Sequence, residues 1–347
     1  MRISAEIITV HPRHPFATSQ DRTVESQSAV IRIEHEGAVG VGEAKVSADA
    51  CGGSAESVFD HLAGVQGMLG EDPFRIEQIL GDLRRDLPDA CCTRAGIDIA
   101  LHDLCGKLLG VPLYRLFGLS PDSAPRTSYT IGIDTIHRML AKLQQAQGYP
   151  ILKLKVGVPG DVELVKAARD RTQAVLRLDA NGGWKNAAEA IERINQLEAY
   201  DIELVEQPIP PGNHDGLREI RERTRIPIYA DEDARTSADL PALAGCVDGI
   251  NVKLMECGGL REAVRMIHVA HGLGMQVMLG CMVETSLSLT AAAHLSPLVE
   301  QADLDSHLLL RDDPFDGLKV REGRIILPSG AGRGQDHLAQ RGRVGSA

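Results

Sequence analysis

The sequence predicts an α/β protein in which a (β/α)8-type barrel follows an N-terminal α+β capping domain. Eight short apolar strands recur between residues 127 and 305, each followed by a helical segment, which is the pattern of such a barrel. The first third of the chain instead places its strands before its helices, as small α+β domains do. A length of 347 residues accommodates a barrel with one addition.

Residues 1–120 form the expected capping domain. Its predicted strands cover residues 5–10, 29–34 and 40–44. A polar stretch from Pro15 to Gln27 between the first two strands predicts a long mobile loop. Helices are expected near Ser54 and from Asp72, where the following proline suits a first turn, and the strongest helical pattern runs from Thr93 to Leu109.

Residues 121–318 form the expected barrel. Its predicted strands cover residues 127–132, 151–157, 175–179, 202–206, 226–231, 250–253, 276–280 and 302–305. Their continuous apolar character is typical of parallel strands that are buried on both faces. Residues 319–347 are expected to return to the capping domain and to end in a partly disordered tail.

Composition excludes several classes of partner. A formal net charge of −11 and an aromatic content of 3% argue against a nucleic-acid partner. No stretch resembles a signal peptide or a membrane span, so we expect a cytoplasmic protein without a membrane partner. The seven cysteines are an odd number without a Cys-x-x-Cys pair, which argues against a disulfide framework or a zinc ribbon.

Two lysines lie on one face of the second barrel strand. Lys153 and Lys155 point the same way because strand side chains alternate between faces. Their ammonium groups repel each other and resist burial, so we expect them to meet an anionic or chemically useful group. On this strand alone, a solvated edge strand, where lysine only blocks aggregation, is an equally good interpretation.

Polar and charged residues follow most barrel strands at the carboxyl ends, where barrel enzymes carry their active sites. In order, they are Thr130, Lys153, Lys155, Asp179, Glu206, Asp231, Lys253, Glu284, Asp303 and Asp305. Any one aspartate taken alone is more often a helix cap. However, Asp179, Glu206 and Asp231 lie on three successive strands and would converge in a closed barrel. Such an oxygen-rich group suits Mg2+.

Lysines on the second and sixth strands would flank this carboxylate group from opposite sides. That arrangement predicts removal of a proton on one face of a metal-bound centre and delivery of a proton on the other. A proton next to a carboxylate is weakly acidic, and a cation on the carboxylate oxygens stabilises the developing charge. Lys155 could act as a base only with a lowered pKa, which both Lys153 and the cation would favour.

Several motifs follow one another across nearly the whole chain. They are Ala95-Gly-Ile-Asp-Ile-Ala-Leu-His-Asp103, Lys153-x-Lys155, Asp179-Ala-Asn-Gly-Gly-Trp184, Glu206-Gln-Pro208, Asp231-Glu232, Asn251-Val-Lys253, Gly280-Cys-Met282 and Asp303-Leu-Asp305. As a set, these motifs are highly specific. By them the chain resembles the enolase superfamily, in its muconate-lactonizing subgroup, and within that subgroup the dipeptide epimerases of the L-Ala-D/L-Glu epimerase type.

The resemblance implies a Mg2+-dependent epimerase that inverts the α-carbon of the C-terminal residue of a dipeptide by two-base 1,1-proton transfer through an enediolate. It implies one Mg2+ per subunit on Asp179, Glu206 and Asp231, with Lys155 and Lys253 as the acid/base catalysts. The implied substrate-binding residues are Lys153, Thr130, Cys281, Met282, and the pair Asp303 and Asp305, which would bind the substrate's α-ammonium. It also implies a small-molecule dipeptide as the partner and a homo-oligomer.

Some assignments stay open. Arg22 lies in the loop where Ala-Glu-selective members of the family carry an arginine, but Asp21 or Glu25 would select cationic side chains instead. The family commonly has serine where this chain has Asp233, and no role follows for Asp233 or Glu284. The alternative function is another enolase-superfamily reaction, namely N-acylamino acid racemisation, cycloisomerisation or dehydration, and a catalytically inactive binding barrel is a remote alternative.

Overall fold

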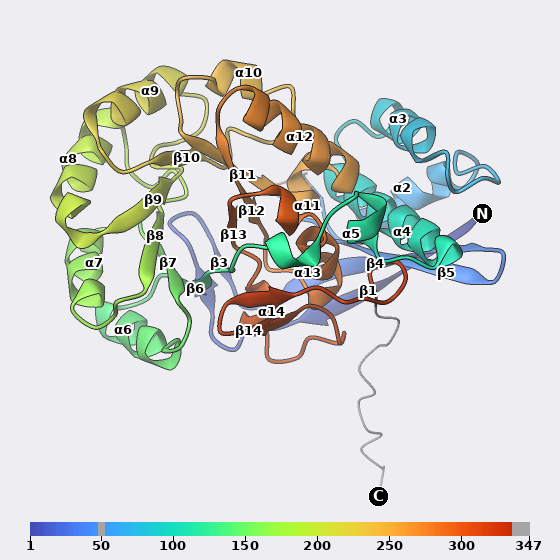
Figure 1. Ribbon diagram of the computed structural model, residues 1–347, viewed down its shortest axis with the longest axis horizontal. Coiled ribbons are helices and arrows are strands. Elements are labelled where there is room, and N and C mark those ends of the chain that lie inside the picture. The colour runs from blue at the N-terminus through green and yellow to red at the C-terminus, as the bar shows by residue number, and fades with distance from the viewer. Residues whose placement is uncertain (48–52, 335–347) are drawn as a thin grey trace, which may run out of the picture.

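The computed structural model describes residues 1–47 and 53–334. They form a cap, made from the first part of the chain, and a ring of strands and helices beside it (Figure 1). The end of the expected disordered tail, residues 335–347, lies outside the described residues.

The cap contains a three-stranded antiparallel sheet in the order β1-β4-β5, followed by helices. Its elements are β1 (Arg2–Val10), β2 (Phe16–Ala17), β3 (Arg22–Thr23), β4 (Ser26–His35), β5 (Ala38–Ala44), α2 (Ser57–Val65), α3 (Ile76–Asp86), α4 (Cys91–Leu109) and α5 (Leu113–Leu116). The three expected strands and three expected helices are therefore confirmed. The expectation of a long mobile loop over residues 15–27 is wrong in part, because β2 and β3 pair as a short hairpin and β4 begins at Ser26.

Helix α4 connects the cap to the ring. Every residue from Cys91 to Gly106 is buried, because the helix packs on β5 and also on α11 (Leu254–Cys257). Gly42 of β5 lies so close to α4 that an added Cβ would be 2.0 Å from the carbonyl oxygen of Gly96. On the side toward the ring, the Asp98 carboxylate accepts a hydrogen bond of 2.9 Å from the backbone of Arg261. The cap and the ring are thereby held as one packed unit.

The ring is an eight-stranded parallel sheet in the strict order β13-β12-β11-β10-β9-β8-β7-β6. Its strands are β6 (Tyr129–Ile131), β7 (Ile151–Lys155), β8 (Val175–Asp179), β9 (Ile202–Glu206), β10 (Ile228–Ala230), β11 (Gly249–Lys253), β12 (Gln276–Gly280) and β13 (Gln301–Ala302). An isolated parallel bridge between Thr127 and Ala302 brings the two edges together. The barrel prediction is confirmed, and β8, β9 and β12 have the predicted bounds.

Helices cover the outside of the sheet, as Figure 1 shows for α6 to α9. They are α6 (Ile136–Gln145), α7 (Asp161–Arg169), α8 (Ala187–Leu197), α9 (His214–Arg223), α10 (Leu240–Leu243), α11, α12 (Leu260–Gly272), α13 (Ser286–Ala293) and α14 (Ser306–Leu309), with 3-10 turns η1 (Pro121–Ser123), η2 (Glu198–Tyr200) and η3 (Ser296–Leu298). In every β-then-α unit, the carboxyl end of the strand lies at the same face of the ring. The residues at these strand ends therefore lie close together.

The C-terminal segment begins with the hairpin β14 (Lys319–Arg321) and β15 (Arg324–Ile326) and then crosses to the cap. There the backbone of Gly332 donates to the carbonyl of Val111, at 2.9 Å, and Arg333 donates to the Asp103 carboxylate, at 2.7 Å.

Two further observations concern the whole described chain. None of its helices combines the length and the apolar character that a membrane crossing requires. Five cysteines are free thiols, namely Cys91, Cys105, Cys246, Cys257 and Cys281. Cys92, in contrast, is disulfide-bonded, which the cysteine pattern did not predict.

The contact between β5 and α4 leads to a stability prediction. We expect Gly42→Ala to lower the free energy of unfolding by about 3 kcal/mol, because the new methyl group overlaps the Gly96 carbonyl in a packed core. The matched control is Gly81→Ala in α3, where the added Cβ meets open space. That change should raise the free energy of unfolding by about 0.5–1 kcal/mol. Chemical denaturation measures both, and equal stability of the two variants would contradict the close packing.

Candidate active site

Three carboxylates meet at the carboxyl ends of neighbouring strands. Asp179 ends β8, Glu206 ends β9 and Asp231 directly follows β10, and each is at most 1% exposed. One ligand oxygen from each lies within 4.8 Å of the other two. Within the described residues, the Oδ1 atom of Asp231 has no hydrogen-bond partner. A buried carboxylate oxygen without a donor is costly, so the group fits a hard divalent cation such as Mg2+.

Electrostatic strain in this cluster agrees with that fit. Burial and then the charge of Asp179 raise the pKa of Glu206 to about 8. Burial also raises the pKa of Asp231 to about 7, against the opposing effect of Lys253. For Asp179, burial is outweighed by two nearby lysines, and its pKa is lowered. The protein alone therefore does not fully support three ionised carboxylates, and a divalent cation held by them would supply the missing positive charge.

Lys153 lies in the middle of the cluster. Its Nζ is 2.7 Å from Glu206 Oε2, 3.0 Å from Asp179 Oδ2 and 2.6 Å from Asp303 Oδ2. Burial opposes the charge of this ammonium, but the three carboxylates outweigh burial and raise the pKa of Lys153 well above its ordinary value. A lysine held in its charged form binds anions and does not accept protons, as expected for a group that binds a substrate carboxylate.

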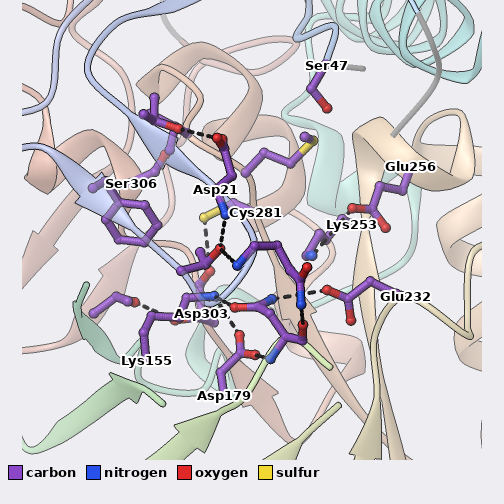
Figure 2. A pocket seen from close by; sticks show the side chains of 18 of the residues that line it. Asp21, Ser47, Lys155, Asp179, Glu232, Lys253, Glu256, Cys281, Asp303 and Ser306 are labelled. Carbon is purple, nitrogen blue, oxygen red and sulfur yellow. Dashed lines mark hydrogen bonds and ion pairs between the residues drawn. The ribbon is translucent and has the colours of Figure 1, made fainter. Parts of the chain in front are cut away.

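Lys155 and Lys253 lie on opposite sides of the carboxylates. Lys155 ends β7 and Lys253 ends β11. In the sheet, β8, β9 and β10 lie between these two strands and carry the three carboxylates. Lys155 Nζ is 2.7 Å from Asp179 Oδ2, and Lys253 Nζ is 2.6 Å from Asp231 Oδ2. Figure 2 shows the two lysines reaching the same cavity from different directions. A group bound between them would present one face to each.

The pKa of the Lys253 ammonium depends on the neighbouring carboxylates. Burial opposes its charge, but Asp231, Glu256 and Glu232 together raise the pKa of Lys253 well above its ordinary value. A cation held by Asp179, Glu206 and Asp231 would weaken this support, and burial would then favour the neutral amine. Metal binding would in that case increase the ability of the lysine to accept a proton.

The two aspartates near β13 have different surroundings. Asp303 accepts a hydrogen bond from the Ser128 hydroxyl and contacts Lys153, so its charge is already balanced. Asp305 accepts the backbone N–H of Thr130, at 2.5 Å, and the described residues offer it no cationic partner. Burial and then the charge of Asp303 raise the pKa of Asp305 to about 7. Asp305 is therefore the member of the pair that still needs a cation.

Asn181 is a site residue to which the sequence reasoning gave no role. Its Oδ1 accepts a hydrogen bond of 2.9 Å from Lys155 Nζ, and its amide nitrogen donates to Glu232 Oε1 at 3.1 Å. It adopts a left-handed φ of 43°, which turns the chain sharply after β8 and aims the amide at the lysine. Its position two residues after Asp179, within the motif that Asp179 begins, was the available signal.

Asp233 and Gln207 support the metal cluster indirectly. Asp233 accepts hydrogen bonds from Gln207 Nε2, at 2.8 Å, and from the backbone of Gly212, at 2.6 Å. Gln207 in turn accepts the backbone N–H of Asp231, at 2.9 Å. Asp233, for which the sequence indicated no role, thus holds the loop after β9. It also orients Gln207, which in turn orients Asp231.

A cavity of about 540 Å3 lies above these groups, between cap and barrel. Among the predicted site residues it is lined by Thr130, Lys153, Lys155, Asp179, Lys253, Cys281, Met282, Asp303 and Asp305. Arg22 is exposed and is not among the lining residues, whereas its neighbour Asp21 is. In the described structure Asp21, and not Arg22, therefore lines this cavity.

Comparison with known proteins agrees with this geometry. Residues 136–338 match the model of the enolase C-terminal domain-like family. Residues 2–118 match the N-terminal domain of the mandelate racemase and muconate lactonizing enzymes. The chain belongs to this enolase-like family.

Several proteins that are similar to the chain are named dipeptide epimerases. The chain is 40% identical, over 91% of its length and 82% of the other, to an L-Ala-D/L-Glu epimerase of Bacteroides thetaiotaomicron. Its fold is similar to a substrate-liganded L-Ala-D/L-Glu epimerase of Bacillus subtilis, with a TM-score of 0.92, 32% identity and coverage of 96% and 98%. It is equally similar to a dipeptide epimerase of Enterococcus faecalis complexed with Mg and the dipeptide L-Leu-L-Tyr, with a TM-score of 0.92, 32% identity and coverage of 96% and 99%.

The carboxylate cluster leads to a prediction about metal binding. We expect Mg2+ at about 100 times its dissociation constant to raise the melting temperature by about 5 °C, because the ion binds only the folded cluster. Asp231→Asn should abolish this shift, and Glu219→Gln, on the outer helix α9, should keep it. Calorimetry with and without the ion measures the effect, and an unchanged shift in Asp231→Asn would exclude Asp231 as a ligand.

The same shift should depend on pH. The pKa values of Glu206 and Asp231 are raised in the metal-free fold to about 8 and about 7, so the folded state holds protons that the unfolded state releases. Metal-free stability therefore falls as pH rises from the ordinary carboxyl range toward 8. Since the ion competes with these protons, the Mg2+-induced shift should be larger at pH 8 than at pH 6.

Proposed function

We propose that the chain is a Mg2+-dependent dipeptide epimerase that inverts the α-carbon of the C-terminal residue. One observation carries the proposal: Lys155 and Lys253 approach from opposite sides of a buried cluster of three carboxylates that fits a divalent cation. This is the geometry that a 1,1-proton transfer needs, because one group must take a proton from one face while another delivers a proton to the opposite face. Family membership and the dipeptide epimerases among its relatives support the proposal.

The chain's residues divide the work of the reaction. Asp179, Glu206 and Asp231 would hold the Mg2+, which withdraws charge from the substrate carboxylate when it is bound. Lys153, held in its charged form, stabilises that carboxylate further. Lys155 or Lys253 removes the α-proton, depending on the configuration of the substrate, and the other lysine returns a proton to the opposite face.

Asp305 gives the proposal its substrate class. Its carboxylate lines the cavity, is buried, and has no cation beside it in the described chain, so it fits the α-ammonium of a dipeptide. Asp303 positions Lys153 and accepts hydrogen bonds from the Ser128 and Thr130 hydroxyl groups. A substrate without a free ammonium, as in N-acylamino acid racemisation, would leave the charge of Asp305 unmatched.

The expected homo-oligomer and cytoplasmic location belong to the same proposal. The oligomer rests on the family resemblance alone, and the location rests on the sequence composition.

The two-base assignment gives the central test. Incubation with Mg2+ and a library of dipeptides in D2O should place one deuterium at the C-terminal α-carbon of the substrates and invert its configuration. Lys155→Ala and Lys253→Ala should each lower epimerisation by about a factor of 1,000, as loss of a general acid or base does. Mass spectrometry and chiral chromatography measure both changes.

Lys185→Ala is the control for this test, because Lys185 is an exposed lysine beyond the end of β8. It should retain full activity. One of the two active-site variants should still exchange the proton of a single stereoisomer, since one base remains. Full epimerisation by either variant would refute the two-base mechanism, and absence of Mg2+-dependent exchange in every dipeptide would refute the function.

The difference between the two aspartates gives a separate prediction. Asp305→Asn should lower kcat/KM for dipeptides with a free α-ammonium by about 10- to 100-fold, because a charge-assisted hydrogen bond is lost while Asp303 still holds Lys153. Asp170→Asn, at the outer end of α7, is the control. Steady-state kinetics with a dipeptide and its N-acetyl form measure the effect. Equal losses for both substrates would show that Asp305 does not bind the ammonium.

A further inference from the structure

The hairpin of β2 and β3 extends from the cap to the carboxyl end of β7, where Lys155 lies (Figure 1). At one side, the Ala17 carbonyl accepts the backbone N–H of Ile133, at 2.7 Å, just after β6. At the other side, the tip of the hairpin contacts the turn after β8. Since β7 lies between β6 and β8 in the sheet, the hairpin spans the end of the strand that carries Lys155.

Two side chains at the tip of the hairpin donate hydrogen bonds to the turn after β8. The Ser19 hydroxyl lies 2.8 Å from the Ala180 carbonyl oxygen and 3.2 Å from that of Asn181. The Gln20 side-chain amide donates to the Asn181 carbonyl at 3.0 Å. The tip itself is ordered by Thr18, whose hydroxyl accepts the backbone N–H of Gln20 at 3.1 Å. The two donors therefore hold the peptide groups on both sides of Asn181.

Asn181 connects this turn to Lys155. Its φ of 43° is uncommon for a residue other than glycine, so the turn needs support from its surroundings. In this conformation the Asn181 amide oxygen accepts a hydrogen bond from Lys155 Nζ at 2.9 Å. Lysine has a flexible four-carbon side chain, so such a partner limits where its amino group can lie. A shift of the turn would therefore move the position that Nζ occupies.

Close packing brings the hairpin, the turn and β7 into direct contact. Gly157, two residues after Lys155, has a φ of 91°. A Cβ added there would lie 2.5 Å from the Ala180 carbonyl oxygen and 3.2 Å from the Ser19 Cβ. From the hairpin, the centroid of the Phe16 ring also lies 6.0 Å from Lys155 Nζ. The hairpin therefore confines this lysine both directly and through the turn after β8.

Lys253 has a different environment. Its Nζ contacts Asp231, at 2.6 Å, and Glu256, at 3.4 Å, and both acids belong to the barrel. Among the described residues, its hydrogen bonds and ion pairs do not involve the hairpin. The hairpin thus acts on one of the two lysines that the proposed reaction needs.

We propose that Ser19 and Gln20 are positioning residues for Lys155. By holding the turn that contains Asn181, they keep the Lys155 amino group where it can exchange a proton with the α-carbon of the substrate. The assignment rests on the proposed function and adds to it two residues from the cap. Proton transfer on the face of Lys155 should therefore depend on the hairpin more strongly than transfer on the face of Lys253.

The test removes both donors by combining Ser19→Ala with Gln20→Met, which keeps the length of the side chain. Each stereoisomer of a dipeptide that is turned over is incubated with Mg2+ in D2O, and α-proton exchange in the recovered substrate is compared with inversion. For the stereoisomer that Lys253 deprotonates, exchange needs only Lys253, whereas inversion also needs Lys155. The double variant should keep most of this exchange and slow inversion at least about tenfold, since a misplacement of about 1 Å can cost about 100-fold.

Controls identify the faces and test for general damage. Whichever of Lys155→Ala and Lys253→Ala still exchanges a proton shows which stereoisomer each lysine deprotonates. The matched control combines Ser123→Ala and Gln144→Met, two exposed positions outside the hairpin, and should keep the ratio of exchange to inversion. Melting curves show whether each variant is folded. Gln20 is exposed, so Gln20→Met alone, which should raise the ratio in the same direction, decides if the double variant does not fold.

The possible outcomes separate the positioning role from the proposed function. Unchanged inversion, or exchange and inversion that fall by the same factor, overturns the positioning role alone, because a hairpin that only covers the substrate would affect both equally. Absence of Mg2+-dependent exchange in every dipeptide with the unmodified protein overturns the proposed function and the assignment with it.

Discussion

The buried charges at the barrel mouth are stable only because cations and anions alternate among them. Lys153 contacts Asp179, Glu206 and Asp303, all three of them buried, and neither the lysine nor the acids could be buried alone at tolerable cost. Burial and then the charge of Asp179 nevertheless raise the pKa of Glu206, so the ionised form of Glu206 is not fully stabilised by the lysines. The fold therefore leaves room for one more positive group, and a divalent cation meets that need better than another side chain because it accepts several oxygen ligands at once.

The strict strand order determines how the two proposed catalytic lysines lie relative to the carboxylates. Since each strand pairs with its neighbours in the chain, residues at successive strand ends become neighbours around the mouth. The carboxylates of β8, β9 and β10 must then lie between the lysines of β7 and β11. Two lysines on one strand, such as Lys153 and Lys155, diverge in role because one is buried among three acids and the other reaches the cavity beside Asn181.

The sequence predicted the barrel, the cap and the cluster well, because each depends on short-range patterns. Apolar strands and the residue at each strand end are local features, so the sequence alone suffices to place Asp179 and Glu206 at the barrel mouth. Contacts between distant segments could not be predicted. Arg22 and Asp21 differ by one position, and only the β2-β3 hairpin decides that Asp21 lines the cavity. The partners of Asp233 likewise come from a loop that no periodicity describes.

Both the cap and the barrel line the cavity, and the proposed reacting groups all belong to the barrel. The reacting groups lie on strands, whose positions the whole sheet holds, whereas Lys45 lies just beyond a cap strand. Glu43 fastens the two parts together, because its carboxylate on β5 of the cap accepts hydrogen bonds from Thr285 and Ser288 at the start of α13. Substitutions of cap residues that line the cavity would change its wall, while the sheet holds the strand ends that carry the lysines and carboxylates. A change at the α4 contact would instead move the cap as a unit and disturb binding of every substrate.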